Sequence, residues 1–179
     1  EQAIPLIKRK KNRARPTFIL AQLYQELNKS QDAIDAYVRV TKLRPEYEME
    51  FYATINQALA YSRRGGNPTE IKEKLFKMLK DDKNIEYRDQ IYYALADMSL
   101  EEREKSDALY YLQQSLEANT DNKKQRAKTY LRLADIQLED RVYEDAQAYY
   151  DSTYQNITEL HPRFEEIENL AQSLTELVT

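Results

Sequence analysis

The chain has 179 residues and a formal net charge of −4, with 41% apolar and 32% charged residues. A nucleic-acid-binding protein is more often strongly basic, so the acidic balance argues against that class. The absence of cysteine excludes disulfides and thiolate metal sites. No apolar run approaches the roughly 18 residues that span a bilayer, and no signal peptide is visible.

Helix-forming residues dominate the whole length of the chain. Only two glycines and five prolines interrupt it, while Ala, Leu, Glu, Gln, Lys and Arg are frequent. No stretch alternates apolar and polar residues for long enough to indicate a strand. The sequence therefore predicts an all-α fold.

An alanine recurs along the chain at nearly constant spacing. Steps of 37, 38, 38 and 37 residues separate Ala21, Ala58, Ala96, Ala134 and Ala171. Steps of 38, 37 and 38 residues separate a second series, Ala33, Ile71, Ala108 and Ala146. Small residues let two helices pack closely, and two interleaved periods predict one helix pair that repeats. We therefore expect an α-solenoid of antiparallel helix pairs with a period of about 38 residues.

These periods also predict the boundaries of the units within a single domain over residues 1–179. The expected units are a partial one at 1–13, four full pairs at 14–47, 51–84, 89–122 and 127–160, and a terminal helix at 163–178. Ala3 and Ile7 indicate that the partial unit is the second helix of a preceding pair. The terminal helix has no following partner, so its apolar face should fray or bind a neighbouring molecule. We expect the chain to be a piece of a longer protein, because it starts at Glu1 and stops within a fifth pair.

The best-formed unit carries the pattern of a known repeat. Its first helix has Leu20, Ala21 and Tyr24, its second has Ala33, Tyr37 and Val40, and Pro45 follows. This order resembles the tetratricopeptide repeat, with Thr17 in place of the usual large residue and Val40 in place of a second alanine. The standard repeat has a period of about 34 residues. We place the extra residues in connectors around 46–50, 81–87 and 119–125.

Catalytic signatures are absent from the sequence. There is no HExxH, no GxSxG, no glycine-rich phosphate loop and no Walker motif. The single histidine, His161, precedes Pro162, and we interpret it as a solvent-exposed loop residue. Carboxylates stand beside basic residues, as in residues 101–105, which is typical of solvated helix faces. We therefore predict a protein that is not an enzyme and needs no cofactor or metal.

The tetratricopeptide resemblance implies a concave groove lined by the first helix of each pair. Its lining residues lie six, three and two places before the small residue and one place after it. The protein-binding candidates are Arg15, Gln22, Tyr52, Asn56, Gln90, Tyr93, Asp97, Lys128, Arg132 and Asp135, with Phe18, Ile19, Ile55 and Leu59 between them. The basic run over residues 8–15 is a further candidate for an anionic partner, either a membrane surface or an acidic protein face. For the run and for each residue singly, plain solvent exposure is the alternative.

Three of these residues match a known peptide clamp in type. Asn56, Lys128 and Arg132 are similar to the carboxylate clamp with which chaperone-binding tetratricopeptide proteins hold a C-terminal EEVD. The unit between them offers Ala94 where the clamp needs a polar residue, and Asn56 is one repeat too far away. A peptide-binding co-chaperone or regulatory adaptor, which would be cytoplasmic, is the alternative function.

Longer phrases resemble one tetratricopeptide family more closely. The segments at 18–24, 44–51 and 173–178 are similar to the PorW/SprE lipoproteins of the Bacteroidota type IX secretion system. The resemblance implies a periplasmic protein on the outer membrane that is required for secretion and gliding. It also implies partners in the PorK/PorN ring and the outer-membrane translocon, and no catalytic residues. The lipid anchor would lie outside this sequence, since the chain has no cysteine. We therefore expect a non-enzymatic protein-interaction scaffold.

Overall fold

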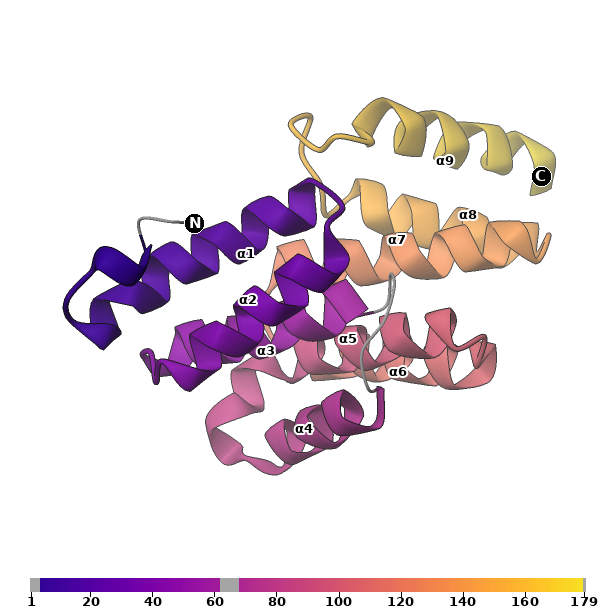
Figure 1. Cartoon of the computed structure of the whole chain (residues 1–179). Helices are drawn as coiled ribbons and strands as arrows, with labels where there is room; N and C mark the ends of the chain where they lie inside the picture. Colours follow the sequence, from indigo (N-terminus) through magenta and orange to yellow (C-terminus); the bar gives the residue numbers. More distant parts are fainter. Residues whose placement is uncertain (1–3, 62–67, 179) are drawn as a thin grey trace. The chain divides into compact units, whose positions relative to one another are not determined.

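The structure, a computed structural model, describes residues 4–61 and 68–178, without the side chains of residues 10 and 11. Across these ranges the chain is helical and contains no strand (Figure 1). The α-helices are α1 (Ala14–Glu26), α2 (Ser30–Lys42), α3 (Tyr47–Tyr61), α4 (Pro68–Lys80), α5 (Arg88–Glu101), α6 (Lys105–Ala118), α7 (Lys123–Glu139), α8 (Tyr143–Tyr154) and α9 (Phe164–Val178). Three short 3₁₀ helices add to them: η1 (Ile4–Leu6), η2 (Lys10–Arg13) and η3 (Asp82–Tyr87). The predicted all-α class is confirmed.

One turn recurs between paired helices. The residues that follow α1, α5 and α7 include Asn28, Arg103 and Arg141, which have φ angles of 55°, 63° and 62°. In each turn two backbone N–H groups reach back into the last helical turn, as when Lys29 N donates to Tyr24 O at 2.8 Å. This is the Schellman geometry, in which a left-handed residue ends one helix and satisfies its last carbonyls. The same three-residue connection therefore reverses the chain in three places.

The chain folds into two compact units. Unit 1 comprises Glu1–Asp81 and Ala94–Ala108, and unit 2 comprises Asp82–Tyr93 and Leu109–Thr179. Helices α5 and α6 thus contribute residues to both. Each unit has a core of its own, and the predicted small positions lie in these cores. All of the residues in the two spaced series are buried, with exposed fractions between 0% and 6%.

The core of unit 1 forms where α2 packs against α1 on one side and α3 on the other. Ala21 and Ala33 are fully buried, which allows the close approach of α1 and α2. Tyr37 fills the space beside them, with the ring of Phe18 at 5.6 Å in an edge-on arrangement. Farther along the chain, Lys72 on α4 pairs with Glu102 and Glu104, so this part of the 101–105 charge run is not a purely solvated face.

The core of unit 2 brings α8 between α7 and α9. Ala134, Ala146 and Tyr150 are buried there together with Ile167, Ala171 and Leu174 of α9. The predicted bare, fraying terminal helix is therefore wrong: Figure 1 shows α9, in yellow, lying along α8. Its apolar face is covered because it packs back on the preceding helix, as α3 packs back on α2.

A buried polar network joins α5, α6 and α7 within unit 2. Asp89 is 1% exposed, and its carboxylate accepts hydrogen bonds from Gln90 N and from Asn119 Nδ2, both at 2.8 Å. Ser115 donates to the Asp89 carbonyl at 2.8 Å and lies 3.0 Å from the Thr129 hydroxyl. Burial raises the pKa of the Asp89 carboxyl, and the bonds it accepts offset part of that rise.

The first described residues differ from the prediction. The segment before α1 forms η1 and η2 rather than an α-helix of a preceding pair, and Ala3 lies outside the described residues. Pro5 within η1 has no N–H to donate to a helical ladder. The Arg13 side chain instead donates to the carbonyls of Ile7 at 2.7 Å and Pro5 at 2.9 Å, and so folds the segment back on itself.

Candidate protein-binding grooves

A groove of about 900 Å³ lies between α1 and the start of α3 in unit 1. The residues that line it are mostly apolar, and the side chains of two of them are well exposed: Ile19 by 48% and Leu23 by 54%. Arg15, one of the predicted binding residues, lies at its rim with Glu46. The residues that line it are Ile4, Asn12, Ala14, Arg15, Pro16, Ile19, Leu20, Leu23, Pro45, Glu46 and Met49. We call this the α1 groove.

The exposed wall exists because α1 is apolar on two sides. One side, with Ala21 and the partly buried Phe18, belongs to the core that α1 shares with α2. The other side carries Ile19, Leu23 and Leu27, which are exposed by 48%, 54% and 64%. Large apolar side chains exposed in a continuous row are typical of a contact surface rather than of a solvated helix face.

Position along the repeat shows that this exposure distinguishes α1 from α3, α5 and α7. Leu23 stands two places after the small residue Ala21. The residues at the same position in α3, α5 and α7 are Ala60, Met98 and Ile136, which are only 2%, 0% and 4% exposed. A position that is buried in three other first helices is therefore open in α1.

A second groove, of about 470 Å³, adjoins the first and shares Ile4 and Leu20 with it. It lies among η1, α1 and the end of α2, and its apolar members are Ile4, Pro5, Leu20 and Leu43. Its charged members are Arg13, Arg39 and Lys42. Together the two grooves have an apolar floor and a rim that is largely basic.

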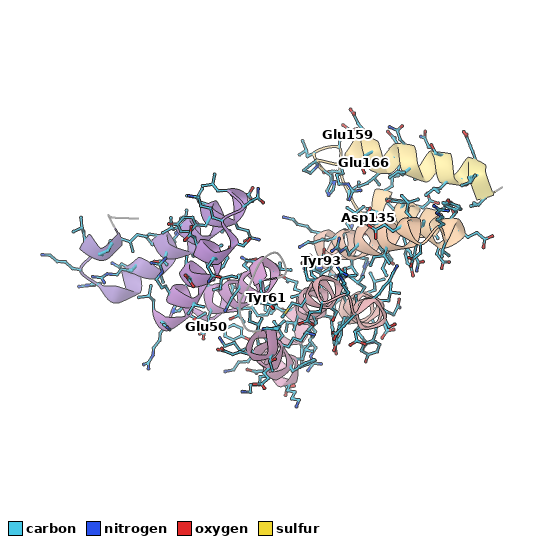
Figure 2. The ribbon with its side chains drawn as sticks, turned by 45° about the vertical axis from the view of Figure 1, so that its right-hand side comes forward. Glu50, Tyr61, Tyr93, Asp135, Glu159 and Glu166 are labelled. Carbon is cyan, nitrogen blue, oxygen red and sulfur yellow. The ribbon has the colours of Figure 1, made fainter. Side chains whose placement is uncertain are left out.

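A polar groove of about 600 Å³ lies between α7 and α9 in unit 2. Figure 2 labels Asp135 on α7 and Glu166 on α9, the two helices that border it. Arg163, from the connector before α9, donates to both carboxylate oxygens of Asp135 at 2.9 and 3.1 Å, and to Glu166 at 2.8 Å. Tyr150 on the groove floor also donates to Asp135, at 2.8 Å.

These contacts leave the charges of the polar groove largely paired. The hydrogen bonds that Arg163 donates to Glu166 and Asp135 raise the pKa of its guanidinium, which stays cationic. Burial, and then the hydrogen bond to Asp135, raise the pKa of the Tyr150 phenol, which stays protonated. The arrangement can fix the connector against α7.

Two of the predicted binding residues meet in unit 2. The Lys128 ammonium on α7 lies 4.4 Å from the ring centroid of Tyr93 on α5, in cation–π geometry. Tyr93 is only 8% exposed, so little of its side chain is accessible to a partner, and its role in binding stays a prediction. The repeat predicts Tyr92 in the core and Tyr93 on the inner face, whereas in the structure Tyr93 is buried and Tyr92 is only partly buried.

Asn56 also has an intramolecular role. Its side chain lies near enough to the Tyr37 hydroxyl to lower the pKa of that phenol, and the hydroxyl donates to Gln25 Oε1 at 2.9 Å. Burial raises the pKa of Tyr37 to about 12 despite the opposing effect of Asn56. Asn56 belongs to unit 1, whereas Lys128 and Arg132 belong to unit 2. The carboxylate clamp therefore stays a prediction, and Lys128 already contacts Tyr93 within its own unit.

The remaining predicted residues differ in exposure. Arg15, Gln22, Tyr52 and Lys128 are exposed, while Gln90, Asp97, Arg132 and Asp135 are partly buried. Sequence reasoning missed Leu23, which is not one of the positions that the repeat predicts to line a groove. It also missed Arg163, which lies in a connector outside the helical period. It placed His161 correctly in that connector, where the partly buried ring accepts a hydrogen bond from Arg163 N at 3.2 Å.

Two kinds of site find no support in the described part of the chain. Its Asp, Glu and His side chains form no cluster that would hold a metal ion. Among the helices over 4–61 and 68–178, none combines the length and apolar character that crossing a bilayer requires. No protein-family profile matches the sequence, and no curated protein matches it.

Proposed function

We propose that this chain is a non-enzymatic scaffold that binds other proteins through the grooves beside its first helices. The observation that carries the proposal is the open apolar wall of α1, where Ile19 and Leu23 are half exposed. The recurring three-residue turn and the buried small positions support a tetratricopeptide-like stack of helix pairs. Such stacks use their extended surfaces to hold partners.

We further propose that the scaffold serves the type IX secretion system. The sequence phrases at 18–24, 44–51 and 173–178 support this assignment by resemblance. In this role the protein would sit in the periplasm at the outer membrane, and its partners would be the PorK/PorN ring and the translocon. The first of these phrases contains both Ile19 and Leu23, so the wall of the groove is part of the resemblance.

Affinity purification tests the proposal. The full-length protein would be recovered from envelope extracts of a bacterium that carries a type IX system, as wild type and as Leu23→Glu. Leu177→Glu is the matched control, because Leu177 is a 61% exposed leucine on α9 and is not among the residues that line the α1 groove. Secretion components recovered with wild type and control but lost with Leu23→Glu support the scaffold. An extract in which wild type recovers no secretion component contradicts the specific assignment.

The adaptor alternative makes a different prediction. A carboxylate clamp would bind a peptide that ends in EEVD, and substitution of Lys128 or Arg132 would abolish that binding. Because Asn56 lies near the Tyr37 hydroxyl and Lys128 lies over Tyr93, our proposal predicts no binding of such a peptide at millimolar concentration. Saturable binding that is lost on Lys128→Ala would favour the adaptor.

A further inference from the structure

We propose that the α1 groove binds an acidic amphipathic helix of a partner protein, with its apolar face on Ile19 and Leu23. This inference rests on the proposed function and specifies the kind of partner it requires. Three features of unit 1 lead to it. They are the packing of α2 on α3, the spacing of the exposed apolar residues on α1, and the charge of the residues at the rim of the grooves.

The first feature indicates that the occupant is a helix. On α3, Ala53 and Ala60 belong to the core that α3 shares with α2. These residues stand five places before and two places after the small residue Ala58. The residues at the same two places on α1 are Pro16 and Leu23, and both line the α1 groove. The face of α1 that borders the groove thus corresponds to the face of α3 that packs against the helix α2.

The second feature sets the length of the contact. Ile19, Leu23 and Leu27 follow one another at four-residue intervals and so lie along one side of α1. At 1.5 Å per residue, this row extends over about 12 Å, or a little more than two helical turns. An amphipathic helix with apolar residues at intervals of three and four matches such a row.

The third feature sets the charge of the partner. The basic members of the α1 groove and its neighbour are Arg13, Arg15, Arg39 and Lys42. Glu46 is the one carboxylate among the described residues that line the two grooves. Arg13 donates to the neutral carbonyls of Ile7 and Pro5, which do not cancel its charge. A helix that covers the apolar floor would place its flanks against this basic rim, where acidic side chains are favoured.

Charge alone would also admit an anionic membrane surface, to which the basic run over residues 8–15 is equally suited. The helix is favoured over the membrane because the apolar residues lie in a groove between α1 and α3 rather than on a protruding face. A bilayer is flat on this scale, so it would reach the rim and leave the floor of the groove uncovered. Membrane binding is therefore one of the outcomes of the test.

The test is a fluorescence anisotropy titration of the chain with two designed peptides. Both have about 16 residues with leucines at helical spacing, and they carry either glutamate or lysine on their flanks. Wild type would be compared with Leu23→Glu and Arg39→Glu, and with the control variants Leu177→Glu and Lys77→Glu. Circular dichroism would show that each variant retains its helix content, and vesicles of anionic phospholipid would be titrated in parallel.

The proposal predicts that wild type binds the glutamate peptide at least about tenfold more tightly than the lysine peptide. Leu23→Glu should weaken that binding by roughly tenfold, as substitutions at the centre of an interface do. Arg39→Glu should weaken it by a smaller factor, because Arg39 lies on the basic rim, and the two controls should leave it unchanged. Equal affinity for both peptides, or binding that survives Leu23→Glu, would overturn it. So would binding to the vesicles without binding to either peptide.

The outcome is separable from that of the proposed function. Secretion partners recovered by affinity purification, together with no binding of the glutamate peptide, would refute the acidic helix and leave the scaffold standing. Specific peptide binding, together with no secretion partner, would support the acidic helix and contradict the assignment to secretion.

Discussion

The hydroxyl of Tyr150 on α8 donates to Asp135 Oδ1 on α7 at 2.8 Å, while its ring lies in the core of unit 2. Tyr37 holds the same place in its own pair, four residues after a buried alanine, and donates to Gln25 on α1 at 2.9 Å. In both pairs a buried ring therefore carries a polar group that fixes the second helix to the first.

This relationship predicts the effect of removing one hydroxyl. Tyr150→Phe should lower the free energy of unfolding by about 1 kcal/mol, the usual net value of a hydrogen bond in a protein. The loss should stay modest because Arg163 continues to donate to Asp135. Urea denaturation measures it, with Tyr110→Phe as the control at a 59% exposed site. Equal losses in both variants would show that the hydroxyl of Tyr150 contributes nothing particular.

The buried alanines make a prediction about packing. Ala134→Leu should lower the free energy of unfolding by about 1–3 kcal/mol, because Ala134 is fully buried and extra methylenes force the helices apart. Ala148→Leu, at an exposed site on α8, is the control and should change little. The measurement is again a urea titration. A variant at position 134 as stable as wild type would refute the close approach of α7 and α8 at this alanine.

The recurring turn predicts a stabilising substitution. Arg141 has a φ of 62°, a conformation that glycine adopts without the steric penalty of a Cβ. Arg141→Gly should therefore raise the free energy of unfolding by roughly 0.5–1 kcal/mol. Glu73→Gly, in the middle of α4, should lower it by about 1 kcal/mol. Destabilisation by both substitutions would mean that the turn after α7 does not have this geometry.

The buried carboxyl of Asp89 predicts a dependence on pH. Since burial raises its pKa, the folded chain binds a proton at a pH where the unfolded chain has released it. The contribution of Asp89 to the free energy of unfolding therefore increases as the pH falls from the raised pKa of the folded chain toward the ordinary pKa of the unfolded chain. The same contribution is lost as the pH rises. Asp89→Asn removes this contribution.

The matching measurement is the free energy of unfolding of wild type and Asp89→Asn at a series of pH values below neutrality. The free energy of unfolding of wild type should increase relative to that of Asp89→Asn as the pH falls. Taking the difference removes the effect of other groups, such as Glu166, whose pKa is lowered by Arg163 and whose contribution has the opposite sign. A difference that is constant, or that moves the other way, would contradict the assignment.

The paired helices could be predicted because each pair repeats the same short-range requirement. Ala21 and Ala33 must be small for α1 and α2 to touch, and the same need recurs at Ala134 and Ala146. The segment before α1 could not be predicted this way. Ile7 fits a helical period, but the proline in η1 and the bonds from Arg13 to backbone carbonyls decide its conformation.

The candidate site was predicted only in part, because exposure depends on which helices happen to cover a position. Ile19 and Arg15, which we expected on the concave face of the solenoid, line the α1 groove, whereas Phe18 and Gln22 do not. Leu23 has the same sequence signal as the buried Met98 and Ile136, and only the neighbourhood of α1 distinguishes it. The repeat predicted Tyr93 as a binding residue, but its side chain is only 8% exposed and its ring lies next to the Lys128 ammonium. Residues 62–67 lie outside the described residues.

Photocrosslinking in living cells tests most directly whether the α1 groove is a protein-binding surface. A photoreactive phenylalanine analogue would replace Leu23 in the groove or, as the control, the exposed Tyr110 on α6. Our account predicts that position 23 crosslinks to a component of the secretion machinery and that position 110 does not. Crosslinks to that machinery from position 110 alone, or none from position 23, would contradict it.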